Sequence, residues 1–401
     1  MRNALLLSFI FCLLTAPQFL SAQRLQYSSE ATISLLTSSP GDELYSTFGH
    51  NTVRINDPVT GLDMVYDYGT FDFDTPGFYE KFVRGKLPYK LARRRTRNFL
   101  AAYKGDNRQV VEAPVQLDSA GTMQVIDFLE TNYLPENQFY PYDFYYDNCA
   151  TRVRDLFEQE FGIVYKDSLD QDLTLRQHLD AYMEEMKWTN FGMDLLLGLP
   201  ADVDADFRME MFLPDYLYEH LRDAQYERDG EVVDLLGPEK VLIQKEEEVY
   251  IPRAITPILA LSVISVFLII MTIAAENERV KNIVDAILFT ILGLAGVLLL
   301  FMWFGTDHQT TKMNLNLVWA NPLHLVTAVI IIFGRYWDIT GTWFLILSVV
   351  YLILLLTGWA WPQQFDWALE AFWFSLVVRC FERAYFHGMF DPVIDRIRGL
   401  R

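Results

Sequence analysis

The sequence predicts an exported α+β domain followed by an all-α transmembrane domain of about five helices. The composition changes near Pro252: the chain before it is polar, acidic and rich in Tyr and Phe, and the chain after it is dominated by Leu, Ile, Val and Trp. The run from Ile255 to Ala275 has the length, about 20 apolar residues, that crosses a bilayer. With 401 residues, 51% of them hydrophobic, the chain can hold a globular domain beside a membrane domain.

The amino terminus is typical of a secretory signal peptide. Arg2 supplies an early positive charge, an apolar core follows, and small residues end at Ala22, where we expect cleavage. We therefore assign residues 1–22 to a signal peptide and residues 23–250 to the exported domain.

Apolar runs within residues 251–390 predict five membrane spans. They lie near residues 255–275, 283–304, 322–334, 342–361 and 367–379. Residues 391–401 form a basic tail. The positive-inside rule places that tail in the cytoplasm, which leaves the amino-terminal domain on the opposite side of the membrane.

Composition and charge exclude several classes of partner. The net charge of −19 argues against nucleic acid, because binding phosphates requires a basic surface. We find no zinc-ligand spacing and predict neither a metal nor a cofactor. The one basic cluster of the exported domain, Lys90 to Arg97, is interpreted either as a solvated face or as a contact for phospholipid headgroups.

Cys149 stands at the start of a predicted helix. Asp147 and Asn148 before it are helix-capping residue types, and an apolar period of 3.6 residues continues until Gly162. Such a position lowers a thiol pKa from about 8.5 toward roughly 3.5 to 7.5 and supplies N–H donors for an oxyanion. A buried apolar cysteine is the alternative for an isolated residue. The remaining mature cysteine, Cys380, lies in the membrane half, so the fold cannot rest on a disulfide.

A predicted hairpin supplies the partners that a cysteine nucleophile needs. One strand carries His50, and the turn signal from Asp57 to Gly61 returns the chain through Asp67. In a hairpin centred on this turn, His50 lies opposite residue 68 or 69, and Asp67 is a candidate for orienting the imidazole. We therefore predict a catalytic group of Cys149, His50 and Asp67.

The order histidine, aspartate, cysteine resembles the circularly permuted branch of the papain-like (NlpC-type) superfamily. In that branch the histidine hairpin comes first and an Asn-Cys pair opens a later helix. The resemblance to the Lnb family is narrower. It is carried by Phe48-Gly49-His50, by Tyr66 to Phe73, by Asp147 to Arg152 and by Thr306-Asp307-His308 in the membrane part.

This resemblance implies a permuted papain-like fold and lipoprotein N-acylation in the inner membrane of a bacterium. A fatty acyl chain would move from a phospholipid to the α-amine of a lipoprotein's amino-terminal diacylglyceryl-cysteine. Cys149 would be acylated first, as a thioester, and His50 would relay protons. Asp67 would be the third member of the group.

Further polar and aromatic residues are candidates for substrate binding. They flank the predicted catalytic residues or lie in the exported loop between the second and third spans, where they concentrate at the membrane surface. These candidates are Asn148, Arg152, Tyr66, Tyr68, His308, Asn314, Asn316 and Trp319. For the loop, an interfacial segment anchored by Trp319 is an equal alternative. Arg152 can bind a donor phosphate or pair with Asp155.

Other functions stay open. A cell-wall peptide amidase or peptidase, or a phospholipase, would use the same cysteine and histidine with another acceptor. A non-catalytic membrane sensor or scaffold requires no contact between Cys149 and His50. Five spans favour a substrate that resides in the bilayer, because one span suffices as a tether.

Overall fold

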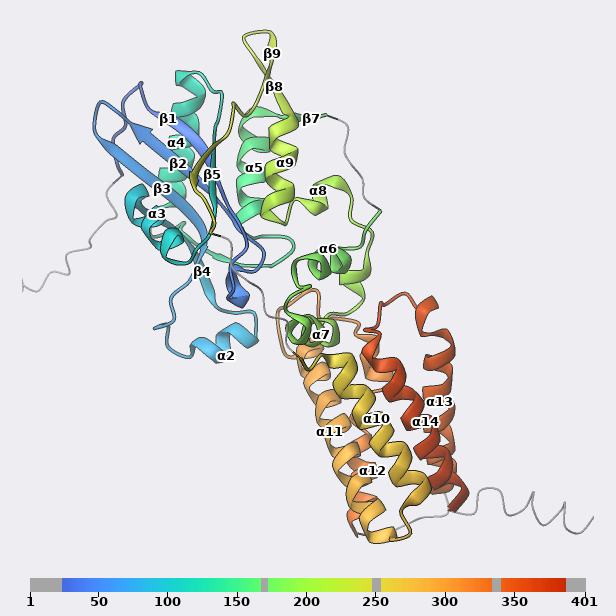
Figure 1. The fold of residues 1–401 in the computed structure, drawn as a ribbon. Helices are drawn as coiled ribbons and strands as arrows, with labels where there is room; N and C mark the ends of the chain where they lie inside the picture. The colour runs from blue at the N-terminus through green and yellow to red at the C-terminus, as the bar shows by residue number, and fades with distance from the viewer. Residues whose placement is uncertain (1–23, 167–171, 247–253, 334–339, 387–401) are drawn as a thin grey trace, which may run out of the picture.

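The computed structural model describes residues 24–166, 172–246, 254–333 and 340–386, which form a sheet-rich domain and a helical bundle (Figure 1). Within these ranges the larger sheet has the antiparallel strand order β10, β5, β1, β2, β3, β4, β6, and the smaller sheet has the order β7, β8, β9. The strands are β1 Thr32–Ser38, β2 His50–Asp57, β3 Leu62–Thr70, β4 Pro88–Arg95, β5 Val110–Pro114, β6 Phe139–Pro141, β7 Val164–Tyr165, β8 Ala224–Arg228, β9 Glu231–Asp234 and β10 Lys240–Ile243.

The turn between β2 and β3 forms as its residue types predict. The Asp57 carboxylate accepts hydrogen bonds from the backbone N–H groups of Val59, at 2.9 Å, and Thr60, at 3.2 Å. Gly61 has a φ of 72°, in the left-handed region that favours glycine. The turn therefore fixes the register of the hairpin.

The hairpin register agrees with the sequence prediction. Val53 pairs with Tyr66 and Asp57 pairs with Leu62. The same register, continued toward the open end of the hairpin, places residue 50 opposite residue 69.

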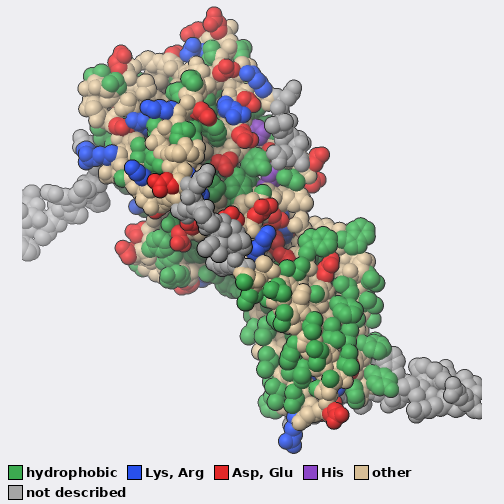
Figure 2. Space-filling model, viewed as in Figure 1, with side chains coloured by type: hydrophobic (Ala, Val, Ile, Leu, Met, Phe, Trp, Pro, Cys, Tyr) green, Lys and Arg blue, Asp and Glu red, His purple; other side chains and the backbone are tan. Residues whose placement is uncertain are grey.

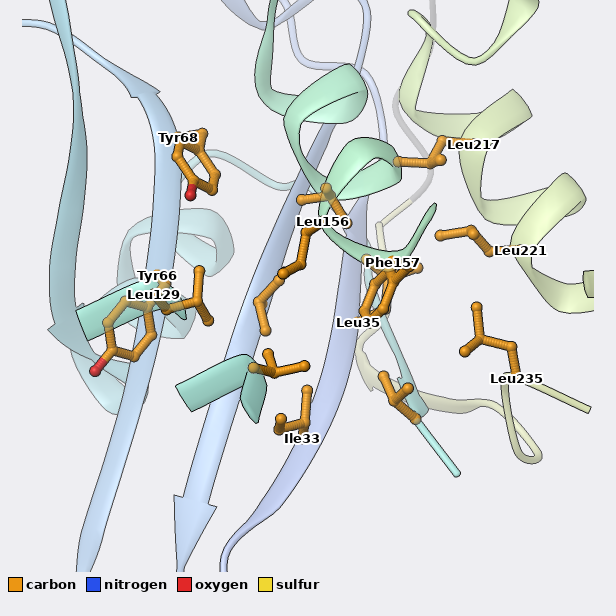
Figure 3. Packing of buried hydrophobic residues seen from close by; sticks show 14 of the residues in the cluster. Ile33, Leu35, Tyr66, Tyr68, Leu129, Leu156, Phe157, Leu217, Leu221 and Leu235 are labelled. Atoms are coloured by element: carbon orange, nitrogen blue, oxygen red, sulfur yellow. The ribbon is translucent and has the colours of Figure 1, made fainter. Parts of the chain in front are cut away.

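Helices cover both faces of the large sheet. On one face lie α4 (Ser119–Asn132), α5 (Cys149–Phe161) and α9 (Pro214–Asp223), and on the other lies α3 (Thr96–Gly105). Figure 3 shows the first of these cores, in which the α5 side chain Leu156 lies near Ile33 of β1. These layers agree with the expected α+β class; the permuted papain-like assignment stays a prediction.

Four short helices among the described residues lie outside these layers. These are α2 (Phe78–Val83), α6 (Leu175–Tyr182), α7 (Lys187–Leu196) and α8 (Phe207–Glu210). Gly198, just beyond α7, donates its backbone N–H to the carbonyl of Thr310 in the bundle at 2.8 Å. The two parts therefore contact each other directly.

The carboxyl-terminal bundle contains a helix at each of the five expected spans. The helices are α10 Pro257–Ala274, α11 Glu278–Phe304, α12 His324–Phe333, α13 Thr340–Thr357 and α14 Ala368–Phe386. Among the described residues, three segments are long and apolar enough to cross a membrane: α10, α11, and α13 with the turn after it, to Ala360. Figure 2 shows hydrophobic side chains over the outside of this bundle. The count of five spans stays a prediction.

Charged residues set α14 apart from the apolar helices. Arg379 and Arg383 are buried and both bind Asp285 of α11, each with an Nε to Oδ distance of 2.6 Å. A buried cation requires a partner, and here each of them has one inside the bundle. The expected signal peptide, 1–22, and basic tail, 391–401, lie outside the described residues.

Candidate active site

Cys149 is the first residue of α5, where the sequence predicted it. The preceding Asn148 caps the helix: its side-chain oxygen accepts hydrogen bonds from the N–H groups of Ala150, at 2.8 Å, and Thr151, at 2.9 Å. The thiol is free and only 8% exposed. The helix start therefore holds a buried, reduced sulfur beside the backbone N–H of Cys149 itself, while those of Ala150 and Thr151 bind the capping side chain.

His50 and Asp67 are joined by a short hydrogen bond, as the hairpin predicted. The His50 Nε2 lies 2.6 Å from one oxygen of Asp67. The ring of His50 also hydrogen bonds the Cys149 thiol. Because Nε2 is occupied by Asp67, Nδ1 is the nitrogen left for the sulfur. The structure thus brings the three predicted catalytic residues together.

The electrostatics of the group favour an ion pair. Burial alone would raise the pKa of the Cys149 thiol. The charge and hydrogen bond of His50, together with the backbone N–H of Asn51, outweigh burial and lower that pKa. Burial alone would lower the pKa of His50, but Tyr103, Cys149 and Asp67 together raise it well above its ordinary value. A thiolate and an imidazolium are therefore the favoured pair of states.

Arg94 is a member of the site that the sequence analysis missed. Its Nη2 lies 2.6 Å from the second oxygen of Asp67, so both oxygens of that buried carboxylate are engaged. We had assigned Lys90 to Arg97 to a solvated face or to lipid headgroups. Asp67 pairs with Ala92 across the strands, and Arg94 is two residues further along the same face. Strand alternation identifies Arg94 once the register of β3 and β4 is known.

Tyr103 and Asn51 were also missed. Tyr103 belongs to α3, on the far side of the sheet from α5, and lies close enough to His50 to raise its pKa. Asn51 follows His50 directly and contributes its backbone N–H to the sulfur. Neither role has a sequence signal, because one depends on tertiary packing and the other on the backbone.

Gly69 lies beside Cys149 and Tyr142. A Cβ on Gly69 would lie 3.6 Å from the Cβ of Cys149 and 3.5 Å from a ring carbon of Tyr142. The φ of Gly69 is 82°, and a register shift interrupts β3 between Asp67 and Thr70. Glycine fits the left-handed backbone at this irregularity of the strand.

Two of the expected substrate-binding residues next to Cys149 have structural partners. The Asn148 amide donates to the carbonyls of Phe144, at 2.7 Å, and Phe212, at 2.8 Å, in addition to capping α5. Arg152 forms a two-point ion pair with Asp147, at 2.6 and 2.7 Å, and not with Asp155. Its guanidinium also lies over the ring of Tyr140, 3.6 Å from the centroid.

Tyr66 and Tyr68 do not share the face of Asp67. Successive residues of a strand point to opposite faces, so both tyrosines enter the core beneath α4 and α5. The hydroxyl of Tyr66 hydrogen bonds Glu130 and Tyr27 there. Cys149 belongs to the same core, and the expected contact of the two tyrosines with substrate stays a prediction.

The candidates from the membrane loop lie at the junction between the two parts of the chain. The Asn314 side chain donates to the carbonyls of Leu195, at 2.8 Å, and Leu196, at 3.0 Å. The Asn316 side chain donates to the carbonyls of Asp194, at 3.2 Å, and Leu195, at 3.1 Å. Both amides hold the loop against the end of α7, and none of these bonds reaches Cys149.

Trp319 and His308 take different positions from those expected. Trp319 is buried inside the bundle against Trp373, and its indole N–H donates to Asn316 at 2.8 Å, so it is not an exposed interfacial anchor. The His308 ring lies 3.1 Å from the carbonyl of Val83, at the end of α2. His308 therefore contacts the exported domain but at a different element from Cys149. In the part of the chain that is described, no group of three His, Cys, Asp or Glu residues is arranged to hold a metal.

The fold and the site define a membrane protein whose sheet-rich amino-terminal domain carries a hydrogen-bonded cysteine, histidine and aspartate. The family model of the Lnb N-terminal periplasmic domain matches residues 20–181, and that of the Lnb transmembrane domain matches residues 245–387. The chain belongs to the Lnb family, and its amino-terminal domain is periplasmic. Neither a curated protein nor a solved structure matches the chain.

Proposed function

We propose that this protein is a lipoprotein N-acyltransferase of the bacterial inner membrane. It would transfer a fatty acyl chain from a phospholipid, through a thioester on Cys149, to the α-amine of a lipoprotein's amino-terminal diacylglyceryl-cysteine. The observation that carries the proposal is the hydrogen-bonded group of Cys149, His50 and Asp67 on a domain joined to a membrane bundle. Such a group supports acyl transfer through a covalent intermediate.

In the first half-reaction the Cys149 thiolate attacks the ester carbonyl of the phospholipid. The sulfur–carbon bond forms, the ester carbon–oxygen bond breaks, and His50 gives its proton to the departing glyceryl oxygen. The products are an acylated Cys149 and a lysophospholipid. The lowered pKa of the thiol and the raised pKa of His50 supply the protonation states that this step needs.

In the second half-reaction the lipoprotein amine attacks the thioester carbonyl. The nitrogen–carbon bond forms, the sulfur–carbon bond breaks, and the neutral imidazole of His50 takes the proton that the amine loses. That proton restores the imidazolium beside the thiolate. Asp67 orients the ring in both steps, and Arg94 holds Asp67.

The backbone supplies one free donor for the developing oxyanion. Asn148 occupies the N–H groups of Ala150 and Thr151, and the N–H of Cys149 itself is adjacent to the reacting sulfur. Backbone N–H groups at a helix start stabilise negative charge without reorganising. We assign the N–H of Cys149 to the oxyanion.

Both lipids of the proposed reaction reside in one leaflet. Figure 1 shows the first turn of α5 at the end of the sheet domain nearer the bundle, with α6 and α7 between them. A thiol held on a membrane-bound domain confines the encounter of donor and acceptor to the membrane surface. The burial of Cys149, which is only 8% exposed, also limits the access of water, which would otherwise hydrolyse the thioester.

The test is mass spectrometry of lipoprotein amino-terminal peptides from cells that carry the wild-type protein, Cys149→Ser or His50→Ala. We expect the N-linked acyl chain to disappear in both variants while protein levels are maintained. His220→Ala is the matched control, because His220 lies with Glu210 away from the hairpin. Persistence of the acyl chain in cells without another N-acyltransferase would overturn the proposal and make cell-wall peptides the next substrates to test.

A further inference from the structure

The lower edge of the sheet domain exposes a group of aromatic side chains. Phe73, in the loop before α2, is 64% exposed, and on α2 itself Tyr79 is 80% and Phe82 is 47% exposed. Figure 2 shows hydrophobic side chains gathered at this edge as well as over the bundle. Exposed rings clustered in this way require a partner, because a soluble surface seldom displays a contiguous apolar patch.

Rings continue from this patch toward the thiol. Phe73 lies 5.0 Å from Phe71 between ring centroids, Phe71 lies 5.4 Å from Tyr89, and Tyr89 stacks on Tyr142 at 4.2 Å. Tyr142 lies beside Gly69, which itself approaches Cys149. The aromatic row therefore runs from the exposed edge to the reacting sulfur, and each of these ring pairs is within stacking or edge contact.

The residues at the end of α2 are attached to the bundle just beyond the end of α11. The N–H of Asp307, three residues beyond α11, donates to the carbonyl of Arg84 at 2.9 Å, and His308 bonds the carbonyl of Val83. Gly85 is pressed against His308: a Cβ there would lie 3.2 Å from its backbone nitrogen. Figure 1 shows α2 on the side of the sheet domain that faces the bundle. These contacts hold α2 at the periplasmic surface of the bilayer.

Cations flank the aromatic rings of α2. Lys81 lies on the helix, Arg84 caps its end and pairs with Glu80 at 3.2 Å, and Lys86 follows with its ammonium 3.9 Å from Asp307. Aromatic rings with flanking cations are typical of segments that settle at headgroup level. The carboxylates of Asp72 and Asp74 lie in the turn before α2, where the N–H of Asp74 donates to Asp72.

We propose that α2 and the loop before it insert into the periplasmic leaflet, and that the aromatic row from Phe73 to Tyr142 receives an acyl chain of a membrane lipid and guides it to Cys149. The insertion stands independently of the reaction. The guidance of the acyl chain rests on the acyltransferase function proposed above.

The insertion is tested with a fluorescent nitrobenzoxadiazole label on Tyr79→Cys in the full-length Cys149→Ser protein. The protein is reconstituted in nanodiscs of phosphatidylethanolamine and phosphatidylglycerol that contain doxyl-labelled acyl chains. We expect at least about twofold quenching at position 79. Val232→Cys, at an exposed site of β9 far from the bundle, is the matched control and should not be quenched. Equal quenching at the two positions, or a label at 79 shielded without quenching, would overturn the insertion and indicate a protein contact instead.

The guidance of the acyl chain is tested with the combined variant Phe73→Ser, Tyr79→Ser and Phe82→Ser. Intact-protein mass spectrometry would measure the acyl adduct on Cys149 after exposure to vesicles of the same lipids. We expect the rate of acylation to fall by about tenfold or more, because three exposed rings lose their lipid contact. Alkylation of Cys149 by water-soluble iodoacetamide should stay within about twofold of wild type, since the thiol itself is untouched.

The matched control is Val164→Ser with Val232→Ser, which removes exposed apolar side chains from the small sheet. Acylation that persists in the triple variant, or alkylation lost together with acylation, would overturn the guidance. If the wild-type protein receives no acyl chain from the vesicles, both the proposed function and the guidance fail. The quenching result still decides the insertion.

Discussion

Asp67 of β3 links His50 of β2 to Arg94 of β4. One of its oxygens lies 2.6 Å from His50 and the other 2.6 Å from Arg94, and the carboxylate is almost completely buried. A buried carboxylate with a cation on each oxygen has little freedom to rotate. Asp67 therefore fixes which nitrogen of His50 faces the sulfur.

This arrangement makes the pH dependence of acyl transfer a test of Asp67. Activity should fall on the acid side as pH decreases through the lowered pKa of Cys149, because the thiolate is lost. It should fall on the alkaline side as pH rises through the raised pKa of His50, because the imidazolium can no longer protonate the leaving group. In Asp67→Asn the alkaline limit should move to lower pH, and the rate should fall by about 10²- to 10⁴-fold.

The measurement is the release of lysophospholipid from vesicles as a function of pH. Asp63→Asn is the control: Asp63 lies on the same face of β3 but binds Arg54 and Thr96. An alkaline limit that stays in place in Asp67→Asn would contradict the assigned role.

Cys149, His50 and Asp67 were predictable from the sequence because two local signals place them. A helix cap identifies the cysteine, and a tight turn sets the register between the histidine and the aspartate. Arg94 and Tyr103 were not predictable, since their roles depend on which face of β4 and which side of the sheet approach the hairpin. Local patterns carry no such information.

Helix α5 owes its position to Asn148. The side chain accepts two hydrogen bonds from the first turn and donates two to the carbonyls of Phe144 and Phe212. One amide thereby joins the helix start to the preceding loop and to the segment before α9. The placement of the neighbouring thiol depends on this single side chain.

Replacement of Asn148 should therefore destabilise the fold. In Asn148→Ala the cap is lost and two buried carbonyls lose their donor, so the free energy of unfolding should decrease by about 2 to 4 kcal/mol. Asn148→Asp keeps the acceptor but places a carboxylate against two carbonyls, and it should be no more stable. Thermal unfolding in detergent followed by circular dichroism measures the effect.

Asn132→Ala is the control, because Asn132 makes one local hydrogen bond at the end of α4. If Asn148→Ala unfolds at the wild-type temperature yet loses acyl transfer, the substrate-binding role first expected for Asn148 would be restored.

Strand periodicity also explains why Tyr66 and Tyr68 lie on the opposite face of β3 from Asp67. Proximity in sequence to Asp67 suggested a shared site, yet neighbours on a strand project to opposite faces. Tyr66 and Tyr68 are within 3% of complete burial under α4 and α5. The helices α5 and α10 to α14, by contrast, follow their apolar patterns and capping residues, which act over a few residues.

The whole molecule depends on a polar junction between its two parts. Arg176 of α6 is fully buried and binds Asp202 at 2.8 and 2.9 Å and Asp194 at 2.8 Å. Asp194 and its neighbours in turn accept hydrogen bonds from Asn314 and Asn316 of the membrane loop. The relative position of thiol and bilayer is therefore set by paired charges and amides and not by apolar packing alone.

Arg176→Met tests how much this polar junction contributes to stability. The substitution leaves two buried carboxylates without their cation, and the free energy of unfolding should decrease by about 3 to 5 kcal/mol. Limited proteolysis should then cut more readily between the periplasmic domain and the bundle. Arg208→Met is the control, because Arg208 pairs at the surface and its loss should cost less than about 1 kcal/mol. If Arg176→Met and Arg208→Met resist proteolysis equally well, other contacts hold the junction.

The division of the chain into two parts followed from composition, but the junction did not. Asp202 accepts a hydrogen bond from the backbone N–H of Gln364, at 3.0 Å, across a sequence separation of 162 residues. No local pattern reports such a pairing. The amides of the polar loop, Asn314 and Asn316, attach it to the end of α7, and their expected contact with substrate stays a prediction.

The large sequence separation between Asp202 and Gln364 also determines when the junction can be completed during synthesis of the chain. Gln363 and Gln364 emerge from the ribosome after α10 to α13, and they are among the last donors to reach the segment around Asp202. The periplasmic domain is translocated long before its attachment to the bundle can form. The contacts of Asp307, His308, Asn314 and Asn316 can form first, once α11 and the loop after it are made. Those of Gln363 and Gln364 complete the junction only when translation is nearly finished.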